Sequence, residues 1–537
     1  MHDVQFSWLP ALCVTLYGLG SWITVNGLWV ELPLLVNFLP EGWNLPSYLS
    51  IIIQIANLGP LAYVPLTKIC RSSGPGFCAG CLQPPECLAN YTILTVGFLS
   101  CILLASFWKT ALFLPGISSE KHSVGLLSLA LCSSLVDCTS SVTFVAYLTG
   151  MPEAYMGALT FGEAFSDIVP SAIALVQGVG GDPECVNITV NGTMKAIAQY
   201  PAPRFSISLY MYFLSIIMGI CLIAFGALDL MPWGLGRAVR RRYRTSMLVR
   251  SSCSPAVTSI SSSATAPNPD PSPRRRRNKG PDDTLVHVAV VRSDFLPSTG
   301  ASTQEVINED NIGVSMPVGP ANRQNSEFFS TRILLVPVFL LSYSCLLTFG
   351  LLPGFQSYST ASYNATTYHL AAALSGLSCA LAVIIATYLF HRSKIKSHSA
   401  PLVHEMLDKT TNLVVASLDT PPHQNHSRLR KSYGVWILLT LLFSVPAGYI
   451  LYLAHASPNP PQLRGTGPFL AVLSWILVRA GFGGLRTWWW LYLSGHSDEP
   501  MALRLAGLAT QMGAAVGAVI SFLLIVYFRL FQSKVYC

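Results

Sequence analysis

Residues 18–61 read GLGSWITVNGLWVELPLLVNFLPEGWNLPSYLSIIIQIANLGPL. The segment holds two long apolar runs, separated by a short stretch rich in Pro, Gly and Asn. A helix rises about 1.5 Å per residue, so roughly 20 apolar residues cross the ~30 Å hydrocarbon core of a bilayer. Only helices and closed barrels satisfy their backbone in lipid, and unbroken runs of this length favour helices. The segment therefore predicts two membrane-spanning helices.

The same pattern recurs along the 537-residue chain, which is 51% hydrophobic and only 11% charged. With a mean hydropathy of +0.48, this composition lies outside the range of soluble proteins. The first run lacks a basic start and a small-residue cleavage site, so we expect it to be a span and not a signal peptide. We predict an all-α integral membrane fold with eleven transmembrane helices, near residues 8–29, 47–69, 91–113, 122–149, 154–177, 206–229, 331–352, 367–390, 433–455, 468–494 and 501–529.

Two polar segments divide the spans into a six-plus-five arrangement. The longer one has a basic start (RAVRRRYR) and a Ser/Pro/Ala stretch, and it lacks the apolar periodicity that a folded segment needs. A two-bundle transporter with a path between the bundles is typical of this layout, although we find no internal repeat. We expect a six-helix bundle over 1–229, a disordered basic cytoplasmic loop over 230–329, spans seven and eight in 330–390, a cytoplasmic insert over 391–432, and spans nine to eleven in 433–537.

Charge sets the expected orientation, because Lys and Arg near span ends stay in the cytoplasm. A cytoplasmic N-terminus and an extracellular C-terminus place the basic clusters around Arg71, Arg240, Arg274, Arg392 and Arg430 inside. The net charge of +8 is then explained by topology and by attraction to anionic lipid, with no nucleic-acid partner. Three glycosylation sequons fall outside in this arrangement, at Asn187, Asn191 and Asn364.

Half of the 14 cysteines lie inside apolar runs, where Cys acts as a small hydrophobe. A cluster follows span two, at Cys70, Cys78, Cys81 and Cys87. Cys78-x-x-Cys81 resembles half of a zinc site, but reduced thiols or palmitoylation are the preferred interpretation in an inside loop, so we expect no metal. On the outside, a disulfide between Cys185 and Cys537 is left open.

Four early spans each carry a stripe of polar or aromatic residues on one helical face. Polar residues inside a membrane either line a cavity or hydrogen-bond neighbouring helices. We expect the serines to hydrogen-bond neighbouring helices. We expect Asn26, Gln54, Asn57 and Asp137 to line a cavity. The stripes are Thr15, Trp22, Asn26 and Glu31; Ser47, Ser50, Gln54 and Asn57; Ser133, Asp137, Ser141 and Phe144; and Thr160, Glu163 and Asp167.

Two arginines, Arg479 and Arg486, lie seven residues apart on one face of span ten. Arg486 can reach the inner interface, whereas Arg479 is too deep and needs a countercharge. We expect Asp167 or Glu163 to supply it. The chain lacks the usual zinc-hydrolase, serine-hydrolase and ATPase motifs, so we do not expect an enzyme, and no cofactor is implied.

Several segments together resemble the eukaryotic riboflavin transporters of the solute carrier group. They are the opening stretch 18–61, LVDCTSSVTFVAYL at 135–148 followed by Gly162-Glu163, TYHLAAALSG at 367–376, VLSWIL at 472–477 and ATQMGAAVGA at 509–518. The resemblance implies eleven spans with the N-terminus inside, residence in the plasma membrane, and sodium-independent riboflavin uptake that external acid favours in some members.

Riboflavin has a flat ring with an imide edge and a ribityl chain of hydroxyls, so amides and aromatic faces suit it. We expect Asn26, Gln54 and Asn57 to hold its polar edges, Asp137 and Ser141 its hydroxyls, and Trp22 or Phe144 its ring. Candidates for proton coupling are Glu31, Glu163, Asp137 and His369. A carrier of another flat heterocyclic or nucleoside-like solute, a non-transporting receptor and a channel remain alternatives, and the oligomeric state is not predicted.

Overall fold

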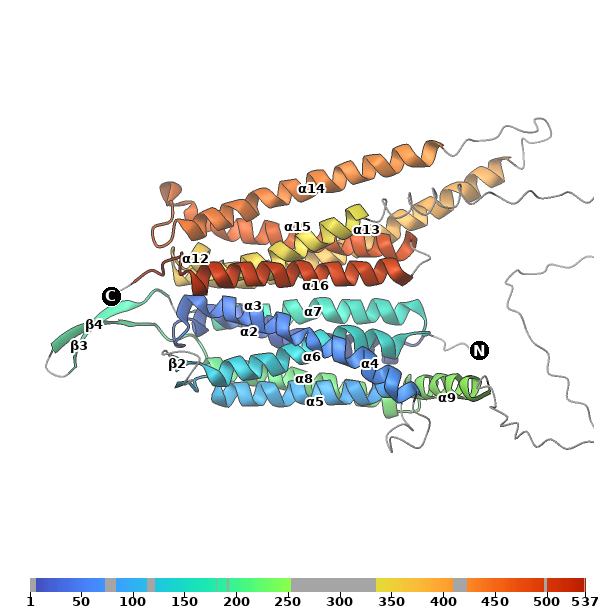
Figure 1. The fold of residues 1–537 in the computed structure, drawn as a ribbon, viewed down its shortest axis with the longest axis horizontal. Helices are drawn as coiled ribbons and strands as arrows, with labels where there is room; N and C mark the ends of the chain where they lie inside the picture. Colours follow the sequence, from blue (N-terminus) through green and yellow to red (C-terminus); the bar gives the residue numbers. More distant parts are fainter. Residues whose placement is uncertain are drawn as a thin grey trace, which may run out of the picture. The chain divides into compact units, whose positions relative to one another are not determined.

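The computed structural model describes residues 6–72, 84–113, 121–179, 181–190, 193–252, 335–408, 423–496, 500–535 and 537. In these ranges ten helices are long and apolar enough to cross a membrane, and a bent pair of shorter helices forms an eleventh span. The predicted all-α membrane fold, with six spans before the long polar segment and five after it, is confirmed. The helices lie side by side in Figure 1.

The N-terminal half, residues 6–252, contains six spans and two short hairpins. Its elements are α1 (Trp8–Leu19), α2 (Ile23–Leu35), η1 (Gly42–Asn44), α3 (Leu45–Ala56), α4 (Leu58–Ser72), α5 (Pro85–Phe107), β1 (Leu112–Phe113), β2 (Lys121–His122), α6 (Val124–Leu148), α7 (Glu153–Gln177), β3 (Glu184–Val190), β4 (Thr193–Gln199), α8 (Ile207–Leu230) and α9 (Gly236–Ser252).

The C-terminal half, residues 335–537, contains five spans, and residues 335–345 are the helical start of the first. Its other elements are the π-helical turn η2 (Leu346–Leu351), α11 (Leu352–Gly354), α12 (Gln356–Thr360), α13 (Ala365–Asp408), α14 (His423–His455), η3 (Leu463–Gly465), α15 (Gly467–His496), α16 (Pro500–Phe522) and the π-helical turn η4 (Leu523–Tyr527).

Two polar segments are more helical than the sequence predicted. The basic start of the long loop forms α9, because Leu235, Val239 and Tyr243 recur every four residues and are buried against the N-terminal half. The insert expected over 391–432 is partly helical, since α13 continues to Asp408 and α14 begins at His423. Residues 253–329 and 409–422 lie outside the described ranges.

An ion pair anchors α9 to the end of α8. Both Nη1 hydrogen bonds of Arg240 reach the buried carboxylate of Asp229, at 2.9 and 3.0 Å. Partial burial disfavours the charge of Arg240, but its hydrogen bonds to Asp229 outweigh this effect and raise the pKa of the guanidinium. We call this end of the molecule the linker end, because the long polar segment between the two halves begins here with α9.

The opposite end carries a β-hairpin that the sequence did not predict. Strands β3 and β4 pair in antiparallel fashion, from Glu184 opposite Gln199 to Val190 opposite Thr193. Cys185 of this hairpin forms a disulfide with Cys537, whose Cα lies 5.8 Å away. The bond that the sequence left open therefore joins the N-terminal half to the C-terminal tail, and we call this end the disulfide end (Figure 1).

The first span is broken between α1 and α2, which are bent by 46° relative to each other. A break leaves the first amide groups of the second helix without carbonyl acceptors. Asp137 of α6 caps them from a neighbouring helix: its carboxylate accepts hydrogen bonds from Val25 N–H at 2.9 Å and from the Thr24 hydroxyl at 2.8 Å. The bend thus depends on one buried carboxylate.

Close contact with α7 fixes the position of α1. A Cβ placed on Gly162 of α7 would lie 2.1 Å from the backbone oxygen of Thr15, so only glycine fits there. Beyond this contact, Tyr17 stacks on Phe144 at 3.9 Å and on Phe225 at 4.9 Å between ring centroids. These rings form the core of the N-terminal half.

We predict that Asp137→Ala destabilises the protein. The substitution leaves the start of α2 without its acceptors in a buried site, at a cost of roughly 2 kcal/mol or more. The amount of monodisperse protein after solubilisation and its melting temperature should both fall. Ser141→Ala, an exposed position on the same helix, is the matched control. A full yield with an unchanged melting temperature for Asp137→Ala would show that the cap is dispensable.

Candidate functional site

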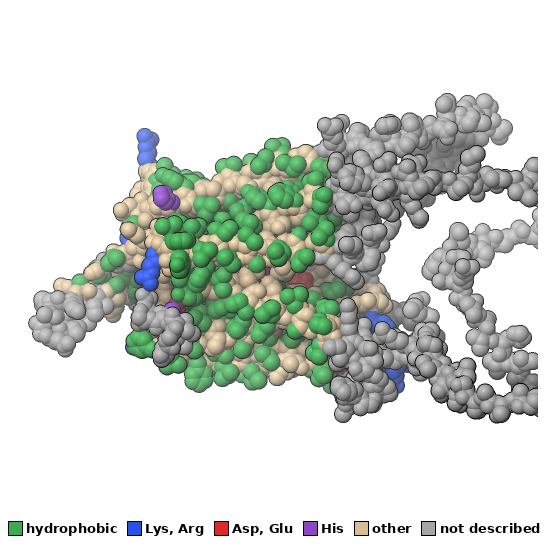
Figure 2. Space-filling view, in the orientation of Figure 1, with side chains coloured by type: hydrophobic (Ala, Val, Ile, Leu, Met, Phe, Trp, Pro, Cys, Tyr) green, Lys and Arg blue, Asp and Glu red, His purple; other side chains and the backbone are tan. Residues whose placement is uncertain are grey.

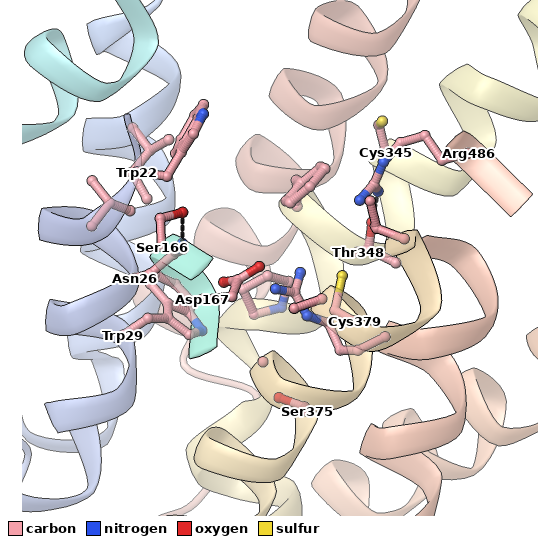
Figure 3. A pocket seen from close by; sticks show the side chains of 18 of the residues that line it. Trp22, Asn26, Trp29, Ser166, Asp167, Cys345, Thr348, Ser375, Cys379 and Arg486 are labelled. Atoms are coloured by element: carbon pink, nitrogen blue, oxygen red, sulfur yellow. Dashed lines mark hydrogen bonds between the residues drawn. The ribbon is translucent and has the colours of Figure 1, made fainter. Parts of the chain in front are cut away.

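A cavity of about 460 Å³ lies between the two halves, and both halves contribute to its walls. The N-terminal half supplies residues of α2, α3 and α7, and the C-terminal half supplies residues of η2, α13, α15 and α16. Figure 3 shows Trp22, Asn26 and Trp29 on one side, with Cys345, Thr348 and Arg486 on the other. The cavity lies in a membrane-spanning unit whose outer surface is mainly apolar in Figure 2.

The cavity is long. Along α15 its wall extends from Trp475 to Trp490, which is about 22 Å at 1.5 Å per residue. Trp475 lies toward the disulfide end, because α15 starts there, and Trp490 lies toward the linker end. Near the linker end the wall also includes Thr160 of α7 and Thr510 of α16.

Hydrogen bonds between described residues join the two halves at the disulfide end. The Ser357 hydroxyl donates to the carbonyl of Trp43 at 2.7 Å, and the Tyr358 hydroxyl donates to Asn44 Oδ1 at 2.6 Å. The backbone N–H of Ala365 donates to Asp182 Oδ1 at 2.8 Å. The Trp43 and Tyr358 rings meet edge to face at 5.7 Å between centroids. These contacts hold the two halves together at the disulfide end.

Four of the seven residues predicted to bind a ligand line the cavity: Trp22, Asn26, Gln54 and Asn57. Asn26 Nδ2 donates a long hydrogen bond of 3.4 Å to Ser166 Oγ, drawn as a dashed line in Figure 3. Asn57 ends α3, and its Nδ2 donates to Gln54 Oε1 at 3.2 Å. At the cavity wall, Gln54 and Asn57 thus pair with each other, and Asn26 contacts α7.

The other three predicted ligand residues do not line it. Asp137 is fully buried and caps α2, Phe144 stacks in the core on Tyr17, and Ser141 is on the exposed side of α6. The prediction assumed one straight first span, whereas the break before α2 leaves donor groups at Thr24 and Val25 that bind the Asp137 carboxylate. We correct the expected site by removing Asp137, Ser141 and Phe144.

Of the candidates for proton coupling, some line the cavity and others do not. Glu163 lines the cavity. Glu31 is buried at 1% exposure and accepts a hydrogen bond from Gln177 Nε2 at 3.0 Å, away from the cavity wall. His369 is buried at 6% exposure between α13 and α7, and it too is absent from the wall.

Charged groups of both signs face the cavity. Asp167 and Glu163 come from α7, and Arg479 and Arg486 come from α15. The charges of both arginines act on Asp167, but no ion pair within 4.0 Å joins Asp167 to Arg479 in the described residues. The predicted pair thus faces the same cavity without direct contact.

Phe349 of η2 holds the two guanidinium groups on the C-terminal side. The Cζ atom of Arg486 lies 4.3 Å from the centre of the Phe349 ring, and that of Arg479 lies 5.7 Å from it. Arg486 also donates a hydrogen bond to Thr348 Oγ1 at 3.2 Å. Arg486 therefore has a fixed position inside the cavity and is not limited to the interface role that the sequence suggested.

Sequence reasoning missed several residues of the wall, among them Trp29, Phe349, Gln356 and Trp475. An apolar or aromatic residue in a span does not by itself indicate a cavity, because most such residues face lipid or the core. Gln356 was missed because it follows the predicted end of span seven at residue 352. The pair Pro353-Gly354 was the available signal, since it marks a break after which the chain continues to line the cavity.

The described residues of the cysteine cluster and of the sequons do not line the cavity. Cys87 is buried, with its Sγ 3.5 Å from Asp229 Oδ1, whereas Cys78 and Cys81 lie outside the described residues. Of the sequons, Asn187 is exposed on β3, and Asn364 uses its Oδ1 to accept the Thr367 N–H at the start of α13. Asn191 lies outside the described ranges.

Comparisons with known proteins cover nearly the whole chain. A family model described as solute carrier family 52, riboflavin transporter, matches residues 6–431 and 425–533. Riboflavin transporter member 3-A of Danio rerio is 32% identical over 97% of this chain and 96% of its own length. Member 3 of Homo sapiens is 30% identical over 99% of this chain and 98% of its own. Among solved structures, a D-xylose-proton symporter matches with a TM-score of 0.46 and 10% identity, over 96% of this chain and 89% of that chain.

We predict that Asp167 and Arg479 are energetically coupled. Asp167→Asn should lower the melting temperature of the purified protein, because two guanidinium groups then share a cavity with one acid fewer. Arg479→Gln should restore part of the loss, with an interaction free energy of roughly 1 kcal/mol in a double-mutant cycle. Strictly additive effects of the two substitutions would contradict the coupling.

Proposed function

Because this chain belongs to solute carrier family 52, the riboflavin transporter family, we propose that it carries riboflavin across the plasma membrane through the cavity between its two halves. The family consists of transporters and not of enzymes. The resemblance identified from the sequence motifs is thereby confirmed at the level of the family, and the substrate and mechanism of this chain are our proposal.

The observation that carries the proposal is a single cavity that combines amides, aromatic rings and charges inside the membrane. Its volume of about 460 Å³ falls within the ~300–1,000 Å³ range of small-molecule sites. Trp22, Trp29 and Trp475 offer aromatic faces for a flat ring, and Asn26, Gln54 and Asn57 offer amide donors and acceptors. A flat heterocycle with a chain of hydroxyls suits both sets of groups.

We propose that the carrier works by alternating access and that this conformation faces the cytoplasm. We take the disulfide end as the closed one, because hydrogen bonds join the halves there, whereas the cavity wall extends toward the linker end. Disulfides form in oxidising compartments, which supports an extracellular position for Cys185 and Cys537. The N-terminus is then cytoplasmic and the C-terminus extracellular, and Asn187, Asn191 and Asn364 are on the glycosylated side.

Coupling to protons is a finer part of the proposal. Glu163 is the candidate that faces the cavity, so it can exchange a proton with water and meet the substrate. We propose transport that does not need sodium and that external acid favours through this carboxyl group. Glu31 and His369 lie away from the wall, so we assign them no direct contact with the substrate.

We predict that cells producing the protein take up labelled riboflavin with saturation kinetics. Unlabelled riboflavin should compete with it, and preloaded riboflavin should accelerate exchange, because one site alternates between the two sides. Replacing sodium should leave the rate unchanged, and Glu163→Gln should abolish any stimulation by external acid. Saturable binding without accumulation would indicate a receptor, and linear flux without exchange would indicate a channel.

The same assay tests the site. Asn57→Ala should reduce uptake at least about tenfold at equal surface abundance, as expected when an amide contact to the substrate is lost. Asn37→Ala is the matched control, because the Asn37 amide donates to the Pro33 carbonyl and does not line the cavity. Equal uptake by the two variants would remove Asn57 from the site.

A further inference from the structure

We propose that Gln356 recognises the imide edge of the substrate ring at the closed end of the cavity. The assignment rests on the proposed function and goes beyond it by fixing which part of the flavin lies at which end. Gln356 is a residue that the sequence-based site did not include. It would act as a determinant of specificity for the ring, and the ribityl chain would extend toward the linker end.

Gln356 is placed at a break in the seventh span. The helix widens into the π-helical turn η2 at Leu346–Leu351 and is interrupted after Gly354, and Gln356 then begins α12. Gly354 permits close contact there, since a Cβ on it would lie 2.8 Å from Ser47 Oγ of the other half. Discontinuous helices and π-helical turns occur often at substrate sites because they direct side chains into the path.

The Gln356 side chain lines the cavity and is only 1% exposed, yet its Oε1 atom has no hydrogen-bond donor within reach. A buried acceptor without a donor is unfavourable, and such groups are rare in native proteins. A ligand that places an N–H or O–H group against Oε1 would remove this cost. The vacant acceptor therefore points to a donor group on the substrate.

The surroundings of Gln356 favour a flat ring over a chain of hydroxyls. Trp475 of α15 lies beside α12, because its Nε1 donates to Ser359 Oγ at 3.2 Å, one turn after Gln356. Trp475, Pro353 and Ala372 give this end of the cavity an aromatic and apolar wall. The charged groups Arg479, Arg486 and Asp167 lie further toward the linker end, where hydroxyls find donors and acceptors.

The chemistry of the flavin ring then identifies one group that can donate to Gln356 Oε1. The oxidised ring system has a single N–H group, N3–H, which lies between two carbonyl oxygens. A glutamine amide can accept from N3–H through Oε1 and donate to a neighbouring carbonyl through Nε2, so it matches the edge in two places. Methylation at N3 removes the donor and adds bulk at this contact.

The test compares riboflavin with 3-methylriboflavin as competitors of labelled riboflavin uptake. In the unchanged chain, we expect 3-methylriboflavin to compete at least about tenfold more weakly, the size of effect expected for one lost hydrogen bond that leaves a buried group unpaired. In Gln356→Leu, which keeps a similar volume without the amide, riboflavin should lose a comparable factor and the two compounds should compete within about threefold of each other.

Gln511→Leu is the matched control, because Gln511 is an amide in the wall near the linker end. This variant should retain the discrimination against 3-methylriboflavin whatever its effect on the rate. Equal competition by the two compounds in the unchanged chain would overturn the assignment without need of any variant, and so would full discrimination in Gln356→Leu. Absence of riboflavin uptake by the unchanged chain would instead overturn the proposed function itself.

Discussion

A polar group inside the hydrocarbon core is costly unless it is hydrogen-bonded within the protein or faces water, and the charged and amide residues of the spans meet this constraint mainly in two ways. One set is paired in the helix interfaces: Asp137 binds Thr24 and Val25, and Glu31 binds Gln177. The other set comes from both halves of the chain and includes Asn57, Glu163, Asp167, Arg479 and Gln511. These residues line one cavity between the two halves.

The two sets depend on each other. The cap that Asp137 provides allows the first span to bend, and the bent helix α2 brings Trp22, Asn26 and Trp29 to the cavity wall. On the opposite side, the break after Gly354 brings Gln356 to the same wall. At both breaks the chain changes direction, so that side chains reach the cavity wall that a straight helix would direct away from it. In the proposed carrier, these interruptions position the residues that meet the substrate.

Apolar length made the spans predictable, because a run of about 20 residues has few other solutions. Helical phase also located Asn26, Gln54, Asn57 and Glu163 on the faces that form the cavity. Phase misassigned Asp137, because it does not reveal that the break between α1 and α2 leaves amide groups for this carboxylate to cap. It failed for Gln356, which follows the end of its apolar run. The disulfide from the β3–β4 hairpin to Cys537 joins residues 352 positions apart, a contact that no local pattern encodes.

The central claim is that the polar residues face a water-filled cavity that is open toward the linker end. Labelling of Gln511→Cys with a charged, membrane-impermeant thiol reagent tests it most directly. The control is Met512→Cys, an exposed neighbour outside the cavity wall that we expect to face lipid, and the unchanged chain gives the background. The account predicts that Gln511→Cys reacts from the cytoplasmic side, that riboflavin slows the reaction, and that Met512→Cys remains unlabelled. Equal labelling of both positions, or none at Gln511→Cys from that side, would contradict it.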